Sequence, residues 1–355
     1  MARSNSAGMK SVPTIKDVAA AAGVSTAAVS KHLNRQQQFS PDVQARIDKA
    51  VKSLGYHSNP LARSIITGRS KTIGISIPDI HNPHFASLVK GANRIASQQG
   101  YTVLLVDSEE DPEDERRSLA DLCMRVDGVI ANSRQREEKL DWMKELSKPV
   151  VQFGGTQKGM GVSLRNREAG YLVGSYLAKL GHQRIAYIGF DNVPSSNDRY
   201  EGIKSRLDEV GLSLQRLDAE SSAPQEGERL CASLLLGPAR PDAVICFNDM
   251  LAFGLIRQAG ALGFHIPEDC SVVGFDNVPF CDYLTPRLSS VNMGGERIGE
   301  IAAQYLIDIL HDRPGTAVMP EPELVLRDSV ADRRGDAPRK ARSTTQGAKP
   351  ARQQG

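Results

Sequence analysis

The stretch TIKDVAAAAGVSTAAVSKHLN, residues 14–34, decides how the front of the chain folds. Thr14 is a favourable helix N-cap residue, and Asp17, three positions later, completes a capping box. Gly23 suits the left-handed conformation in which many helices end, and Ser25 caps a second helix that runs to the end of the stretch. Two short helices joined through a glycine form a helix-turn-helix. The sequence therefore predicts this motif.

A third helix is predicted directly after the motif. Ser40 is its N-cap, Pro41 occupies the first helical position, and Gly55 marks its end. The second helix is too short to be stable alone, since isolated helices below roughly 12–15 residues are marginal in water. We expect helices one and three to hold its inner face, which carries Ala28, Val29 and Leu33.

The outer face of the second helix is expected to enter the major groove of DNA. The methyl group of Ala27 suits a thymine methyl, and Lys31 can donate to guanine or to phosphate. An alternative is a three-helix bundle that binds protein, which the positive charge of this region disfavours. The positions expected at the DNA are Thr14, Ser25, Thr26, Ala27, Ser30, Lys31 and Asn34.

Charge is segregated along the 355 residues, although the net charge is only +2. Residues 1–70 carry 10 basic and 3 acidic side chains, and residues 331–355 carry 7 and 2. The segment between them therefore has a net charge of −10. A basic head on an acidic body is typical of a nucleic-acid-binding module joined to a larger domain with another task.

The quoted stretch and the following GYHSNPLARSIITGRSKTIGI resemble the DNA-binding head and hinge of the LacI/GalR family of bacterial transcriptional regulators. In that family the hinge forms a short helix on operator DNA and wedges apolar side chains into the minor groove. The resemblance places the wedge on Ile65 and a supporting contact on Arg63. Ile65 departs from the usual leucine. His32 also departs from the family pattern, and we assign it no role.

Residues 72–330 alternate short apolar runs with amphipathic helical stretches, a pattern that predicts a doubly wound α/β architecture. The expected strands are TIGISIP, YTVLLVDS, VDGVIAN, PVVQFGG, RIAYIGF, DAVICFND and SVVGFDN, and the expected helices include 85–99, 168–180, 198–210 and 250–262. The resemblance implies two subdomains like those of a periplasmic sugar-binding protein, with chain crossovers near 162, 290 and 320. Ligand is then expected in the cleft between them.

The resemblance also names ligand-binding positions in this cleft. His84 and Phe85 follow the first strand, and an aromatic ring there can stack on a sugar. Arg199 and Asp276 would form a donor and acceptor clamp for a polyol, supported by Asn248. An alternative is that Arg199 and Asp276 form only a salt bridge.

Arg165 departs from the family pattern, which usually has an aspartate at this position. Together with His84 and Arg199 it would make the cleft more basic than a neutral-sugar site, which favours an acidic effector. Alternatively, Arg165 pairs with a carboxylate such as Asp191 or Glu168.

Other functional classes lack their signatures in the sequence. A dinucleotide-dependent enzyme with an appended DNA-binding head is the alternative, but no GxGxxG, GxxxxGK[ST] or GxSxG motif is present. His81 and His84 have no neighbouring ligand cluster, so neither a metal nor a cofactor is expected. The five scattered cysteines are expected to be buried free thiols. The chain has no secretory signal and no apolar run of membrane-spanning length, so it is expected to be cytoplasmic.

The expected organisation is a flexible arm (1–13), a helix-turn-helix domain (14–57), a hinge (58–70), an effector-binding and dimerisation domain (71–330) and a disordered basic tail without leucine heptads (331–355). We expect a homodimeric, ligand-responsive regulator without enzymatic activity that binds a near-palindromic operator. It is expected to repress carbohydrate or sugar-acid catabolic genes in response to a sugar, sugar acid or sugar phosphate.

Overall fold

A computed structural model describes residues 13–33, 37–56, 68–153, 161–162 and 164–335. The chain divides into a head within residues 1–70 and a body within residues 71–355. The head contains three helices, α1 (Ile15–Ala22), α2 (Thr26–Leu33) and α3 (Pro41–Leu54). Its core combines Val18, Ala19, Ala22, Val29, Ile47 and Ala50. The predicted helix-turn-helix and third helix are confirmed.

Local capping explains where these helices begin and end. The Thr14 backbone N–H and hydroxyl both donate to Asp17 Oδ2, at 2.8 and 2.7 Å. The backbone N–H of Ala28 donates to Ser25 Oγ at 3.2 Å, which satisfies a free donor at the start of α2. Gly23 and Gly55 take the left-handed conformation after α1 and α3, with φ of 65° and 62°. Glycine adopts this conformation without steric cost.

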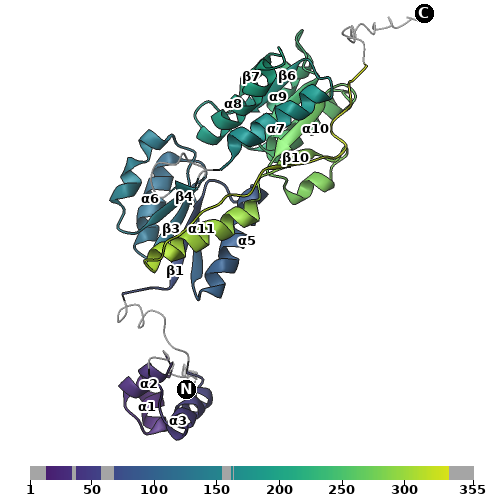
Figure 1. The fold of residues 1–355 in the computed structure, drawn as a ribbon. Coiled ribbons are helices and arrows are strands. Elements are labelled where there is room, and N and C mark those ends of the chain that lie inside the picture. The colour runs from purple at the N-terminus through teal and green to yellow at the C-terminus, as the bar shows by residue number, and fades with distance from the viewer. Residues whose placement is uncertain (1–12, 34–36, 57–67, 154–160, 163, 336–355) are drawn as a thin grey trace, which may run out of the picture. The chain divides into compact units, whose positions relative to one another are not determined.

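The first subdomain of the body is built on a five-stranded parallel sheet in the order β2-β1-β3-β4-β5. Figure 1 labels β1, β3 and β4 of this sheet. Its strands are β1 (Thr72–Ile77), β2 (Thr102–Asp107), β3 (Gly128–Asn132), β4 (Val150–Phe153) and β5 (Gly161–Val162). The helices that belong to it are α5 (Pro83–Gln98), α6 (Pro112–Cys123), η1 (Glu137–Lys139), η2 (Asp141–Glu145) and α11 (Gly295–Leu310). Alternate strand residues face opposite layers: Ile130 joins the core of α5 and α11, whereas Val129 joins the core of α6.

The second subdomain has a six-stranded sheet in the order β11-β10-β9-β8-β6-β7. Its strands are β6 (Ile185–Gly189), β7 (Leu214–Asp218), β8 (Ala243–Cys246), β9 (Ser271–Phe275), β10 (Ser289–Asn292) and β11 (Glu323–Val325), of which only β11 is antiparallel. Its helices are α7 (Asn166–Lys179), α8 (Pro194–Asp208), α9 (Pro224–Leu235), α10 (Asp249–Ala261) and η3 (Pro279–Asp282). Both sheets share one doubly wound strand order, and the predicted α/β class is confirmed.

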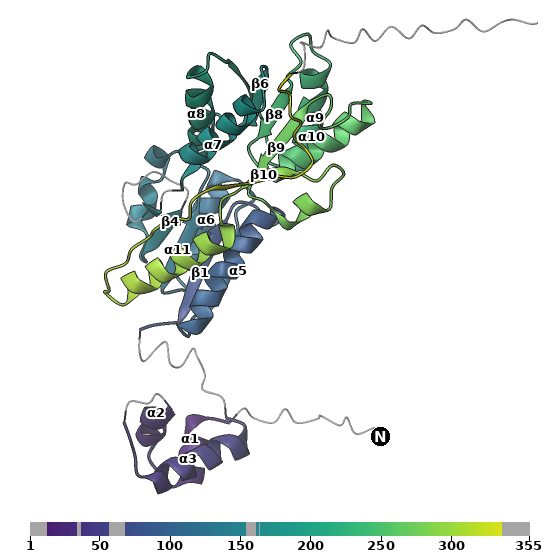
Figure 2. The ribbon, with the colours of Figure 1, turned by 45° about the vertical axis from the view of Figure 1, so that its right-hand side comes forward.

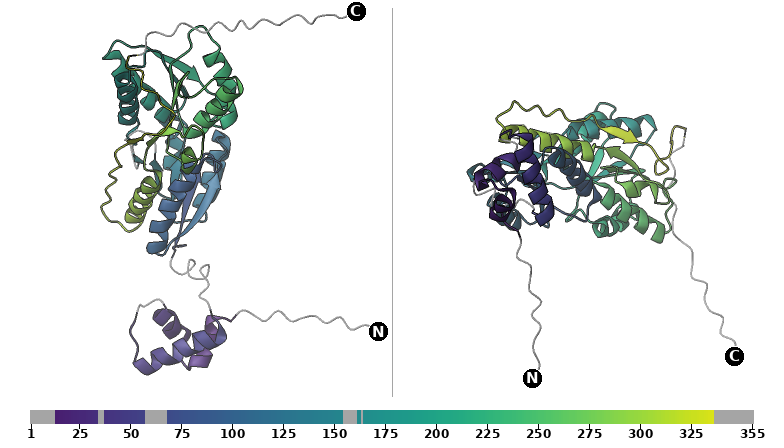
Figure 3. Two further views of the ribbon diagram at one scale, coloured as in Figure 1. Left: turned by 90° about the vertical axis from the view of Figure 1, so that its right-hand side faces the viewer. Right: turned by 90° about the horizontal axis from the view of Figure 1, so that it is seen from below.

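The chain passes between the subdomains three times, after β5, between β10 and α11, and between α11 and β11. Figures 2 and 3 show the result: the yellow-green α11, late in the sequence, lies beside the blue α5 in the first subdomain. The subdomains are therefore joined by three separate segments of one chain.

Pairs of glycines let three helix pairs approach backbone to backbone. A Cβ at Gly170 of α7 would lie 2.1 Å from the carbonyl oxygen of Arg199 on α8, and one at Gly202 would lie 2.0 Å from that of Arg167. Gly227 and Gly254 form the same contact between α9 and α10, and Gly91 and Gly299 form it between α5 and α11. No larger residue fits these crossings without moving a helix.

Two features of the body differ from the sequence-based expectations, and its cysteines agree with them. Strand β2 is not a fully buried run, because it lies at the sheet edge and leaves Leu104 and Leu105 39% and 37% exposed. The expected start of the disordered tail at residue 331 is too early, because Arg333 is held in place by the body. Its backbone N–H donates to the carbonyl oxygen of Leu180, and its Nη2 donates to the carbonyl oxygens of Pro267 and Glu268. The five cysteines are buried and free, as predicted.

Candidate functional site

The second helix of the head presents the side chains that sequence reasoning assigned to DNA. Thr26, Ala27 and Lys31 are exposed on α2, and Ser30 is partly buried. Lys31 Nζ donates to Gln37 at 3.2 Å, a contact with an exposed neutral side chain. Thr14 and Ser25, the two capping residues, are also exposed. The remaining DNA-binding candidates, Asn34, Arg63 and Ile65, lie outside the described residues.

His32 has a role that the sequence did not reveal. Its Nε2 lies 2.8 Å from Asp48 Oδ1, and its side chain is 16% exposed. The contact connects α2 to α3, and so it helps to orient the helix that carries Thr26, Ala27 and Lys31.

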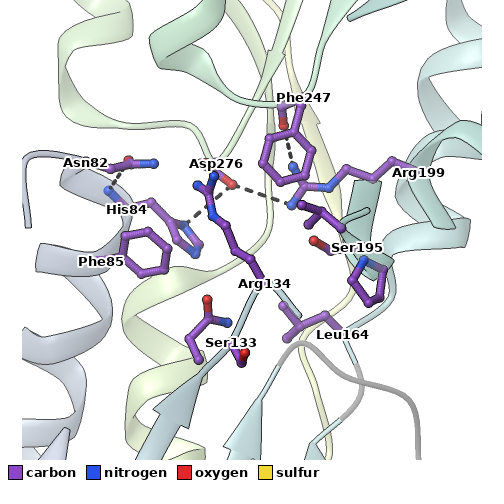
Figure 4. Close-up of a pocket in the computed structure, with 13 residues that line it drawn as sticks. Asn82, His84, Phe85, Ser133, Arg134, Leu164, Ser195, Arg199, Phe247 and Asp276 are labelled. Carbon is purple, nitrogen blue, oxygen red and sulfur yellow. Dashed lines mark hydrogen bonds and ion pairs between the residues drawn. The ribbon is translucent and has the colours of Figure 1, made fainter. Parts of the chain in front are cut away.

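The body has a pocket at the carboxyl ends of the strands, between the two sheets (Figure 4). Its lining follows β1, β3, β6, β8 and β9, so it lies where the strand order of each sheet reverses. Such switch points are the usual ligand sites of open α/β sheets. The pocket has a volume of about 50 Å³ and is lined by Asn82, His84, Phe85, Asn132, Ser133, Arg134, Leu164, Val193, Pro194, Ser195, Arg199, Phe247 and Asp276.

Arg199 is held rigidly in this pocket and is only 4% exposed. Its Nε donates to Asn166 Oδ1 at 2.9 Å, and Nη1 donates to the carbonyl oxygen of Phe247. The guanidinium also stacks on the rings of Phe247 and Phe275, with centroid distances of 4.7 and 4.4 Å. These contacts leave Nη2 directed towards Asp276 (Figure 4).

Asp276 faces both Arg199 and His84 across the pocket. Its Oδ1 lies 3.6 Å from Arg199 Nη2 and 3.6 Å from His84 Nδ1, which are ion-pair distances rather than short hydrogen bonds. The backbone of Asp276 has a φ of 97°, a conformation that is strained for any residue except glycine. The salt bridge between Arg199 and Asp276, which the sequence left open as an alternative, is present, and both residues line the pocket.

A buried carboxyl group supports the loop that carries Asp276. Asp249 accepts hydrogen bonds from the backbone N–H of Val278 at 2.8 Å, from Cys281 Sγ at 3.2 Å and from Ser290 Oγ at 2.6 Å. Burial, reinforced by the negative charge of Asp276, raises the pKa of Asp249 to about 7, and the three hydrogen bonds oppose this shift. Asp249 is thus a structural anchor beneath the pocket.

Arg134 is a pocket residue that sequence reasoning missed. It is the second residue after β3, and its Nη1 lies 2.8 Å from Glu110 Oε1. Its guanidinium faces the rings of Phe190 and Phe247 in the second subdomain, at 5.5 and 6.0 Å. Burial lowers the pKa of Arg134, and the charge of Glu110 opposes that change. The position after a strand at the switch point was the signal that could have identified it.

Two expected pocket residues lie elsewhere. Asn248 is 1% exposed and is the N-cap of α10. Its Oδ1 accepts a hydrogen bond from the backbone N–H of Leu251 at 2.9 Å, so this side chain caps the helix and does not line the pocket. Arg165 Nη1 lies 2.7 Å from Glu321 Oε1, outside the pocket. The ion-pair alternative is the one observed, with Glu321 instead of Asp191 or Glu168. Arg165 therefore adds no positive charge to the pocket lining, contrary to the expectation from the sequence.

Comparison with known proteins agrees with this division of the chain. Residues 14–59 match the bacterial regulatory proteins of the lacI family, and residues 175–330 match a periplasmic binding protein-like domain. The HTH-type transcriptional repressor PurR of Mannheimia succiniciproducens is 32% identical over 328 residues, which cover 89% of this chain and 98% of that protein. The chain belongs to the LacI family.

Solved structures of LacI-family proteins share the fold. The lac repressor dimer bound to operator and the anti-inducer ONPF matches with a TM-score of 0.81 at 22% identity, covering 90% of this chain and 99% of that one. A LacI-family regulator from Enterococcus faecium with bound ribose has a TM-score of 0.66 at 31% identity, covering 74% and 99%. This LacI-family chain is accordingly a DNA-binding transcriptional regulator of the repressor type.

Two more properties of the described residues concern membranes and metals. Among them, no helix is both long and apolar enough to cross a membrane. The same residues contain no group of three or more histidine, cysteine or acidic side chains placed to hold a metal ion.

Proposed function

We propose that this LacI-family chain is a homodimeric repressor whose heads read a near-palindromic operator and whose bodies each bind a small polar effector. The observation that carries the proposal is a pocket lined from both subdomains, with His84 and Arg134 on one side and Arg199 and Asp276 on the other. A ligand that contacts both sides binds one degree of closure better than another. That difference is what couples effector binding to DNA binding.

The effector we propose is a polyhydroxyl compound of the sugar class, which makes carbohydrate catabolic genes the expected targets. The charges of the pocket are paired, Arg134 with Glu110 and Arg199 with Asp276, so the site offers both donors and acceptors without a large excess of positive charge. Phe85 and Phe247 add apolar ring faces. With Arg165 outside the pocket, a neutral sugar fits better than a sugar acid or a sugar phosphate. The ribose bound to the related Enterococcus faecium regulator supports this class.

Exposed apolar side chains on the body support dimerisation. Leu104 and Leu105 lie on the edge strand β2, and Met124, at the end of α6, is 82% exposed. Phe280 and Tyr283, in and after η3, are 55% and 83% exposed. Exposed apolar groups of this size commonly mark contact surfaces between proteins.

The hinge residues extend the proposal to DNA bending. Ile65 is expected to unstack a base step, and Arg63 to contact the operator backbone. We expect Ile65→Ala to retain effector binding while losing operator affinity and the DNA bend, measured by energy transfer between dyes at the operator ends. An unchanged bend would contradict this role.

The effector site is tested by thermal-shift screening of sugars, sugar acids, sugar phosphates and purine bases, followed by calorimetry. We expect Arg199→Gln and Asp276→Asn to abolish the response to sugars while operator binding persists. Arg206→Gln, on the same helix but outside the pocket, is the matched control. Binding that survives both pocket substitutions would show that the ligand site is elsewhere.

The DNA-reading surface is tested with two lysines of the head. Lys31→Ala is expected to weaken specific operator binding by roughly 1–3 kcal/mol if Lys31 contacts a base. Lys49→Ala removes the same charge from an exposed position on α3 and should reduce binding evenly across sequences. Equal effects of the two substitutions on operator preference, measured by competition with unrelated DNA, would refute the assignment.

A further inference from the structure

The pocket around Arg199 and Asp276 is too small for a complete effector. Its volume is about 50 Å³. One water molecule occupies roughly 30 Å³ of liquid, and ligand pockets commonly measure about 300–1,000 Å³. Directly beside it lies a groove of about 960 Å³, which shares Asn132, Arg134 and Val193 with the pocket. Among the described residues, this outer groove offers a ligand seated on Arg199 and Asp276 further room past Arg134.

The outer groove lies at the carboxyl ends of β1, β2, β3, β6 and β7, so both subdomains contribute to it. Its first-subdomain wall contains Pro78, Ser108, Glu110, Pro112, Glu113, Glu115, Asn132, Arg134, Gln135, Arg136 and Lys139. Its second-subdomain wall contains Phe190, Asp191, Asn192, Val193, Asp218, Ala219 and Glu220. A ligand in the groove would thus contact both subdomains, as would a ligand in the pocket around Arg199 and Asp276, which we call the inner pocket.

Glu115 provides the decisive feature of the groove. It lies in the first turn of α6 and is only 4% exposed. Its Oε2 accepts hydrogen bonds from Ser133 Oγ and Gln135 Nε2, both at 2.9 Å. Its other oxygen, Oε1, is buried and has no hydrogen-bond partner within the described part of the chain. An unsatisfied buried acceptor is costly, and a ligand donor would remove that cost.

The surroundings of Glu115 select the kind of donor. Burial raises the pKa of Glu115, opposed only by its hydrogen bonds from the neutral side chains of Gln135 and Ser133. The groove lining carries six carboxylates and three cationic side chains. The first-subdomain wall carries three of these carboxylates and all three cations, and arginines outside the groove pair with the three carboxylates of the second-subdomain wall. The groove as a whole therefore has no unbalanced charge. What selects the ligand group is Glu115 Oε1, which can accept a hydrogen bond from a hydroxyl or amino group but not from a carboxylate or a fully ionised phosphate.

We infer that the outer groove is a second subsite of the effector site, where a hydroxyl or amino group of the same ligand donates to Glu115 Oε1. The inference rests on the proposed function, because it takes the inner pocket as the seat of the first part of the ligand. It makes the effector a two-part molecule, such as a disaccharide, whose outer part carries a hydroxyl or amino group.

The test compares D-glucose and D-ribose, which have one ring, with cellobiose and maltose, which have two. Calorimetry on the full-length dimer is expected to show a preference of about tenfold or more for a two-ring sugar, the effect of one added hydrogen bond to a charged group. Glu115→Gln should remove that preference and leave one-ring affinity unchanged. Asp121→Asn, an exposed carboxylate on the same helix outside the groove, should change neither.

The outcomes separate this inference from the proposed function. Loss of sugar binding in Arg199→Gln together with full two-ring preference in Glu115→Gln overturns the second subsite and retains the inner pocket. An equal loss of one-ring and two-ring affinity in Glu115→Gln also overturns it, because the residue then acts through the fold. If none of the four sugars binds the wild-type protein, the sugar assignment and this inference fail together.

Discussion

Gly202 allows a direct test of the idea that backbone contact between helices positions the effector pocket. A Cβ at this position would lie 2.0 Å from the carbonyl oxygen of Arg167 and 2.9 Å from the backbone nitrogen of Tyr171. Ordinary contact begins at 3.4 Å, so Gly202→Ala requires α7 and α8 to separate locally by about 1.4 Å. Backbone cannot give way as a flexible side chain can.

The cost can be estimated from two opposing effects. Overpacking of a well-packed site costs about 1–3 kcal/mol, and replacing glycine by alanine within a helix returns up to about 1 kcal/mol. We therefore expect Gly202→Ala to lower the free energy of unfolding by about 1–2 kcal/mol. For a body of this size the transition temperature would fall by roughly 2–8 °C. Arg199 lies one helical turn earlier, so its 2.9 Å bond to Asn166 should also weaken, with loss of effector affinity.

Gly260 supplies the matched control. It lies near the end of α10, and a Cβ there would meet no atom within 4 Å. Gly260→Ala should therefore stabilise the protein by up to about 1 kcal/mol, because only the helix-propensity effect remains. Both variants are compared with the wild type by thermal and urea unfolding, followed by circular dichroism. If the two substitutions change stability in the same direction, backbone contact does not determine how α7 and α8 pack.

Two further predictions concern stability. The pKa of Asp249 is raised from its usual 3.8 to about 7, so the native state retains a proton that the unfolded chain releases between these values. Its contribution to stability therefore falls as pH rises from about 4 to 7, by up to roughly 4 kcal/mol, and urea unfolding of Asp249→Asn should show a flatter pH dependence than the wild type. Deletion of residues 336–355 should leave the transition temperature and the oligomeric state unchanged, whereas deletion of 332–355 should lower the transition temperature because Arg333 is lost. Sedimentation and thermal unfolding of the two truncated chains check this, and a loss of stability already in the shorter deletion would contradict it.

Sequence reasoning was most accurate where structure depends on neighbouring residues. The capping residues Thr14 and Ser25 and the terminal glycines act within a few positions, so the helices of the head follow from local patterns. The long apolar runs of the body identify its central strands for the same reason. Strands β5, β7, β10 and β11 were missed. The buried Ser289 and Ser290 of β10 are polar, and their hydroxyl groups bond to Arg327 and Asp249, which are distant in sequence.

The candidate site was predictable only in part. His84, Phe85, Arg199 and Asp276 line the pocket because each follows a strand or begins a helix at the switch point. Arg165 illustrates the limit, because its partner Glu321 is contributed by a segment that crosses between the subdomains 156 positions later. Glu115 depends on partners in a loop after β3, Ser133 and Gln135, whose path no local pattern specifies, whereas Arg134 could have been identified by its place after a strand at the switch point.

The placement of α11 affects how the protein is made. Leu306 of this helix packs against β3 at Gly128, and Gly299 packs against Leu88 of α5, so a face of the first subdomain is covered by residues synthesised about 200 positions after it. During translation that face, which includes Ile130, stays uncovered until α11 has left the ribosome. Contacts this distant in sequence slow folding, and uncovered apolar surface favours aggregation. We therefore expect nascent chains that end before residue 295 to bind chaperones, and the first subdomain to become protease-resistant only after the second has been synthesised.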